Sequence, residues 1–141
     1  ADVLVENYRP GTMEKLGLGP KYLTKKFPKL VYAACSGFGR TGPWSKKPAY
    51  DLIVQALGGI MSLTGIKGAE PIRVGSSIGD IVAGLFTTIG IQSAIIRRQT
   101  TDIGGVIDIS MLDCQIAILE NAVSRYFSEK KIGKLYEDVI R

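Results

Sequence analysis

Hydrophobic positions along the chain fall into short apolar runs and longer stretches with helical spacing. The short runs predict strands and lie at residues 3–5, 30–34 and 106–109. The longer stretches predict helices and lie at residues 12–16, 21–27, 50–57, 79–98 and 111–127. Strands that alternate with helices are typical of an α/β domain built on a mainly parallel sheet. We therefore expect an α/β fold.

Three of these elements carry further expectations. The run at residues 3–5 is β-branched and apolar, so we expect a buried strand. Thr12 stands where it can cap the short helix that follows. The stretch at residues 79–98 is apolar nearly all round, which predicts a helix buried in the middle of a domain. Its uncharged run falls short of the ~20 apolar residues that a membrane span needs, so we expect no contact with a membrane.

Composition is that of an ordinary soluble globular protein, with 45% hydrophobic and 22% charged residues over 141 positions. This length suits one modest domain. The first strand has no preceding element to pair with, so we expect an internal piece of a longer protein. The net charge of +5 is uneven, because residues 1–50 hold nine Lys and Arg against three Asp and Glu. Such a segment suits a phosphate-bearing ligand, but on charge alone a solvated basic face is the favoured interpretation.

Cysteine and histidine usage narrows the chemistry. Cys35 and Cys114 both lie in apolar surroundings and are expected to be small core residues of a reduced, cytoplasmic protein. The chain contains no histidine, which excludes histidine-based catalytic triads and common zinc sites from these residues. We therefore predict no metal site. The first residues lack the charged start and long apolar core of a signal peptide.

Asp80 is the candidate for chemistry that the residues themselves suggest. It is the only carboxylate between Glu70 and Asp102, and it lies where a glycine-marked turn enters the helix expected at residues 79–98. Free backbone N–H groups and the helix dipole stabilise an anion at such a place. An ionised aspartate there can attack an activated acyl group. A plain capping role is the alternative, and the spacing alone leaves both open.

Five stretches carry a resemblance to a known family. They are ADVLVENYRPGTMEKLGL, LVYAACSGFGRTGPW, AYDLIVQALGGIMSLTG, PIRVGSSIGDIVAGLF and VIDISMLD. In this order they resemble the class III CoA-transferases, a family that includes formyl-CoA transferase, carnitine CoA-transferases and α-methylacyl-CoA racemases. The resemblance implies that residues 1–127 are part of the Rossmann-like parallel-sheet portion of the family's large domain. Residues 128–141 would then form a C-terminal helical or linker segment.

The resemblance also implies an activity and its partners. Family members move CoA from an acyl-CoA donor to a carboxylic acid acceptor, so the chain is expected to come from an acyl-CoA:carboxylate CoA-transferase. CoA and acyl-CoA would be substrates, with no permanently bound cofactor. The full protein would be an interlocked homodimer in the cytoplasm, without nucleic acid or membrane partners.

Individual residues take roles from the same resemblance. Asp80 matches the catalytic aspartate, which forms an acyl-aspartyl anhydride and then an aspartyl-CoA thioester. A further group matches positions that hold CoA: Asn7, Tyr8, Arg9 and Lys15 at the nucleotide, and Ala49, Tyr50 and Asp51 along the pantetheine channel. Arg9 and Lys15 can pair with phosphates and Tyr8 can stack on adenine, although surface charge and, for Tyr50, a core aromatic are the structural alternatives.

Tyr50 separates the two enzyme branches of the family. The matching position in the racemase branch resembles a histidine that acts as a general base. A tyrosine phenol is a poor substitute because its ordinary pKa lies near 10. We therefore favour a transferase over a racemase, and a non-catalytic CoA- or nucleotide-binding module is the alternative from another class.

Overall fold

The computed structural model describes residues 1–66 and 68–130. Their elements are, in chain order, β1 (Val3–Glu6), α1 (Thr12–Lys15), α2 (Pro20–Lys26), β2 (Val31–Ser36), α3 (Asp51–Gly58), the 3-10 helix η1 (Ile60–Leu63), α4 (Ile78–Thr101), β3 (Gly105–Ser110), α5 (Met111–Ala117) and α6 (Asn121–Glu129). Each predicted strand and helix has a counterpart among them. The expected α/β class is thus confirmed.

The three strands form one parallel sheet in the order β1-β2-β3. In the register of the sheet, Val31 of β2 pairs with Val3 of β1 on one side and with Gly105 of β3 on the other. The central strand β2 is buried from Val31 to Cys35. A parallel strand covered on both faces is expected to be a continuous apolar run, and VYAAC has this character.

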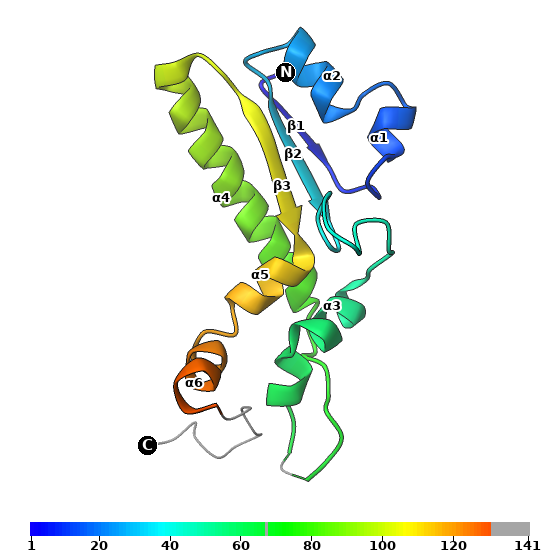
Figure 1. Cartoon of the computed structure of the whole chain (residues 1–141), viewed down its shortest axis with the longest axis vertical. Coiled ribbons are helices and arrows are strands. Elements are labelled where there is room, and N and C mark those ends of the chain that lie inside the picture. Colours follow the sequence, from blue (N-terminus) through cyan, green and yellow to red (C-terminus); the bar gives the residue numbers. More distant parts are fainter. Residues whose placement is uncertain (67, 131–141) are drawn as a thin grey trace.

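Helices cover both faces of β2, whose alternate side chains point in opposite directions. Tyr32 and Ala34 pack with Leu23 of α2. Cys35, on the other face, packs with Val82 and Ala83 of α4. Figure 1 shows α4 running beside the strands, with α1 and α2 on the far side of the sheet, and with α3, α5 and α6 gathered beyond the carboxyl ends of the strands. This end of a parallel sheet is where α/β proteins place their ligands.

Two local expectations are wrong. The strand at residues 3–5 is half-exposed, and Val5 is 59% exposed, because β1 is the edge strand of the described sheet and α4 packs mainly on β2 and β3. Thr12 is the first residue of α1 and does not cap it. Gly11 occupies the N-cap with a φ of 93°, a left-handed conformation that glycine adopts without steric cost.

The helix expected to be buried at residues 79–98 is α4, and most of it is exposed. Its buried residues are Gly79, Val82, Ala83 and Thr87, whereas Ile96 is 65% exposed. An apolar pattern all round a helix does not reveal how much protein surrounds it. By length and composition alone α4 is also apolar enough to cross a membrane, which is weak evidence for one such helix. Within the described residues α4 packs on β2, β3, α3 and α5.

The single helix expected at residues 111–127 is divided into α5 and α6. The break falls at Glu120, whose φ of 43° no helix can accommodate. The segment proposed for residues 128–141 begins within α6, and residues 131–141 lie outside the described residues.

Candidate active site

A cleft of about 680 Å³ opens between the turn after β1, the end of β2, residues 45–51 and α4. Seven of the eight residues proposed from the sequence line it: Asn7, Tyr8, Arg9, Ala49, Tyr50, Asp51 and Asp80. Lys15, the last residue of α1, is exposed outside the cleft lining. Residues that are far apart in the sequence therefore meet in one place. In the described part of the chain, no group of three or more Cys, Asp or Glu side chains is arranged to hold a metal ion.

Asp80 is the third residue of α4, since Ser77 occupies the N-cap. The plain capping role considered for Asp80 is therefore wrong. Its carboxylate lies in the first turn, where free N–H groups and the helix dipole favour an anion. Partial burial and, secondarily, the negative charge of Asp51 raise the pKa of Asp80 above its ordinary value. The arrangement presents a carboxylate of enhanced basicity to the cleft.

Asp51 is buried and connects α3 to the start of α4. Its Oδ1 accepts a hydrogen bond of 2.8 Å from the backbone N–H of Gly79, the residue before Asp80. Its Oδ2 accepts one of 2.7 Å from the side-chain amide of Gln55. Gln55 is fully buried and in turn accepts a hydrogen bond of 2.8 Å at Oε1 from the backbone N–H of Val74. The pair Asp51 and Gln55 thus fixes the segment that leads into Asp80.

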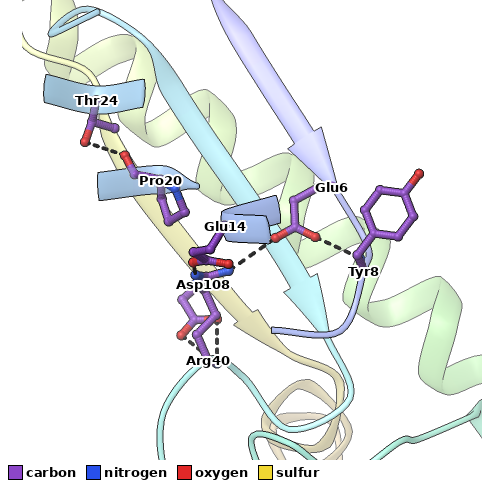
Figure 2. Close-up of polar contacts among 7 residues, drawn as sticks. All are labelled: Glu6, Tyr8, Glu14, Pro20, Thr24, Arg40 and Asp108. Carbon is purple, nitrogen blue, oxygen red and sulfur yellow. Dashed lines mark hydrogen bonds and ion pairs between the residues drawn. The ribbon is translucent and has the colours of Figure 1, made fainter. Parts of the chain in front are cut away.

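The turn at residues 7–9 is held by a network centred on Arg40, which Figure 2 shows. Glu6 accepts a hydrogen bond of 2.7 Å from the backbone N–H of Tyr8 and pairs with the Arg40 guanidinium at 3.4 Å. The same guanidinium pairs with Glu14 of α1. The backbone N–H of Arg40 donates to the carboxylate of Asp108 on β3, at 3.0 Å to Oδ2. One arginine therefore connects β1, α1 and β3 behind the turn.

The side chains at the mouth of the cleft are solvent-accessible. Tyr8 and Arg9 are exposed, and so is Tyr50, at 76%. The core role considered for Tyr50 is therefore wrong. At the other side of the cleft, the hydroxyl of Ser36 is buried without a hydrogen-bond partner among the described residues. Exposed aromatic and basic side chains, together with the buried Ser36 hydroxyl and the exposed Asp80 carboxylate in the same lining, suit a ligand with a nucleotide end and a reactive end.

A family model described as CoA-transferase family III matches residues 1–138. The chain belongs to this family. The resemblance inferred from the five sequence stretches is confirmed. Curated relatives include the acetyl-CoA:oxalate CoA-transferase of Acetobacter aceti, 49% identical over 124 residues that cover 87% of this chain and 32% of that protein. The succinyl-CoA:glutarate CoA-transferase of Mus musculus is 36% identical over 133 residues, or 94% of this chain and 30% of that protein.

A solved structure gives the same result. A CAIB/BAIF family protein from Brucella suis superposes with a TM-score of 0.93 at 40% identity, over 96% of this chain and 36% of that one. The chain thus spans about a third of the length of the CoA-transferase family III proteins it matches.

Two supporting residues of this CoA-transferase segment were missed from the sequence. Gln55 lies four residues after Asp51, a spacing that places both side chains on one helix face and that signals a possible hydrogen bond. Arg40 lies in a glycine-rich loop, and its partner Asp108 is 68 residues away. No local pattern indicates that contact.

Proposed function

We propose that the protein containing this chain transfers CoA from an acyl-CoA to a carboxylic acid, with Asp80 as the nucleophile. The observation that supports this most is the position of Asp80 in the first turn of α4, facing a cleft that six other proposed ligand-binding residues also line. The matched proteins from Acetobacter aceti and Mus musculus are named as CoA-transferases for oxalate and glutarate.

The proposed reaction proceeds by exchange at the Asp80 carboxylate. An Asp80 oxygen attacks the thioester carbonyl carbon, the carbon–sulfur bond breaks, and CoA leaves as a thiolate from an acyl-aspartyl anhydride. The thiolate then attacks the Asp80 carbonyl and releases the donor acid, which leaves an aspartyl-CoA thioester. The acceptor carboxylate attacks this thioester, and the released thiolate takes the acceptor acyl group and restores Asp80. Every nucleophile in the sequence is an anion, so no histidine base is required.

The raised pKa of Asp80 supports this role. A carboxylate whose pKa lies above its ordinary value is a stronger base and therefore a better nucleophile once ionised. The neighbouring Asp51 contributes to that shift and also fixes the start of α4. Attack requires the reacting atoms to be held ~3–3.5 Å apart, so a fixed helix start favours it.

We propose the following contacts for CoA. The nucleotide lies at the exposed turn, where Arg9 can pair with phosphate, Tyr8 can stack on adenine and Asn7 offers an amide. Lys15 would reach the outer phosphates from α1, outside the cleft. The pantetheine arm passes Ala49, Tyr50 and Asp51 towards Asp80.

We further propose that this segment is the Rossmann-like part of the large domain of a cytoplasmic, interlocked homodimer. The resemblance to the family supports the homodimer and the domain assignment. The two buried free thiols, Cys35 and Cys114, suit a reducing compartment.

Trapping of the covalent intermediate tests the proposed mechanism. The full-length protein is incubated with acyl-CoA and then with hydroxylamine, which converts an anhydride or thioester on Asp80 to a hydroxamate. Mass spectrometry of the peptide containing SSIGDIVAG is expected to find this modification in wild type and not in Asp80→Asn. A racemase would exchange the α-proton of the substrate without acylating Asp80, and a binding module would do neither. An unmodified Asp80 peptide during measurable CoA exchange contradicts the mechanism.

A further inference from the structure

Helix α4 contains three glycines, and two of them are explained by close packing. A Cβ atom on Gly79 would lie 3.0 Å from Oδ1 of Asp51, and one on Gly90 would lie 3.0 Å from Cγ2 of Ile107. Gly84 differs: apart from its two chain neighbours and the backbone of its own helix, no described atom lies within 4 Å of the place where its Cβ would stand. Glycine inside a helix destabilises it relative to alanine. Packing within the described residues therefore gives no reason for glycine at position 84.

The place of Gly84 suggests another reason. It lies four residues after Asp80, on the same face of the helix and about 6 Å further along its axis. Both residues line the cleft. Because Cβ atoms on a helix tilt towards its N-terminus, a side chain at position 84 would extend over the turn that carries Asp80. No side-chain atom of Asp80 lies within 4 Å of that Cβ position, so the space between the two residues is open.

The wall beyond Gly84 is uncharged. Thr88 and Ile91 continue the cleft lining along α4. The hydroxyl of Thr88 donates a hydrogen bond of 2.9 Å to the carbonyl oxygen of Gly84, so it is satisfied within the helix. A neutral wall with one missing side chain suits the carbon skeleton of an acyl group better than a phosphate.

We infer that Gly84 is a specificity-determining residue whose missing side chain makes room for the acyl group while Asp80 carries it. This inference rests on the proposed function. In the acyl-aspartyl anhydride, the acyl carbonyl carbon is bonded to an Asp80 oxygen, so the remaining acyl carbons extend within a few ångströms of that carboxylate. Position 84 is one helical turn away from Asp80. The pantetheine arm, by contrast, approaches along residues 49–51.

The test uses Gly84→Ala and Gly84→Val in the full-length enzyme with a series of straight-chain acyl-CoA donors of increasing length. We expect kcat/KM for the longest accepted donor to fall at least tenfold more than for the shortest in Gly84→Val, with a smaller difference in Gly84→Ala. Affinity for free CoA, measured by calorimetry, is expected to change less than twofold in both variants. The Tm of Gly84→Ala is expected to be no lower than that of wild type, since alanine favours a helix. Gln92→Ala, an exposed change on the same helix outside the cleft lining, is the matched control.

Three results would overturn the inference. An equal loss for all donors together with weaker CoA binding would place the pantetheine arm at Gly84. A lower Tm for Gly84→Ala would show that Gly84 is required for packing. A donor profile identical to that of Gln92→Ala would show that the space has no part in selection. Asp80→Asn separates this inference from the proposed function. If that variant still transfers CoA, the proposed function fails. If Asp80→Asn is inactive but the Gly84 variants lose the same kcat/KM for every donor length, only the role of Gly84 is contradicted.

Discussion

The backbone N–H of Gly79 donates a hydrogen bond of 2.8 Å to the buried carboxylate of Asp51. Because Gly79 directly precedes Asp80, this bond sets where the first turn of α4 begins relative to α3. The same carboxylate also adds a negative charge near Asp80 and helps to raise its pKa. One buried residue therefore influences both the position and the basicity of the proposed nucleophile.

Asp51→Asn is predicted to change both the pKa of Asp80 and the stability of the protein, and the two effects can be measured separately. Removing the charge lowers the pKa of Asp80, so the acidic limb of the pH profile of kcat/KM should move to lower pH in the full-length enzyme. The asparagine amide cannot accept from both Gly79 and Gln55, and this unsatisfied contact should lower stability by about 1–3 kcal/mol. Denaturant unfolding measures the second effect. Asp113→Asn, at an exposed carboxylate on α5, is the control, and an unchanged pH profile in Asp51→Asn would contradict the electrostatic coupling.

Asp80→Asn is predicted to abolish transfer without weakening the fold. Activity should fall on the order of 10³-fold or more, because the nucleophile is removed. An acid with a raised pKa in the folded state destabilises the protein when ionised, and that cost disappears as the pH falls below its unfolded-state pKa. The Tm of Asp80→Asn should therefore equal or exceed that of wild type at neutral pH. The difference should narrow as the solution is acidified. If Asp80→Asn turns over within tenfold of the wild-type rate, Asp80 is not the nucleophile.

Arg9→Ala and Lys15→Ala are predicted to weaken CoA binding to different extents. Arg9 lines the cleft, so its loss should cost about 1–2 kcal/mol at low salt. Lys15 lies outside the lining, and its loss should cost less. Both effects should shrink as the salt concentration rises, because exposed charges are screened. Calorimetry at two ionic strengths measures them, with Lys25→Ala on α2 as the control. Unchanged affinity for both variants at low salt would move the nucleotide site elsewhere.

Arg40→Met is predicted to lower the free energy of unfolding of the protein. Its guanidinium pairs with Glu6, whose side chain is only 4% exposed, so the change leaves a buried carboxylate uncompensated. Losing one partner of a buried pair typically costs about 3–5 kcal/mol, and the partial exposure of Arg40 places the expected loss near the lower end. Denaturant unfolding of the full-length protein tests this. The variant Arg40→Lys keeps the positive charge but cannot pair with Glu6 and Glu14 at once, so its loss of stability should be smaller. Equal stability of Arg40→Met and wild type would contradict the role of the network.

The sequence predicted the strand–helix order and the parallel sheet because both depend on local hydrophobic periodicity and on the glycines and prolines that end strands and helices. The residues themselves singled out Asp80, and the family resemblance added six more residues that line the cleft. The exposure of α4 could not be predicted, since an apolar helix looks the same whether its outer side is covered or not. The break between α5 and α6 at Glu120 could not be predicted, because glutamate has a high helix propensity. The contact of Arg40 with Asp108 depends on the register of β2 against β3, which only the folded sheet determines.

The outer side of α4 has a practical consequence for protein production. Leu85, Ile89 and Ile96 stand exposed along it. Contiguous apolar surface of this kind promotes association between molecules and retention by chaperones. Expressed alone, the 141-residue chain should therefore sediment as concentration-dependent aggregates. Replacing Leu85 and Ile96 by glutamate should improve its recovery in the soluble fraction, without touching the Asp51–Gly79 contact.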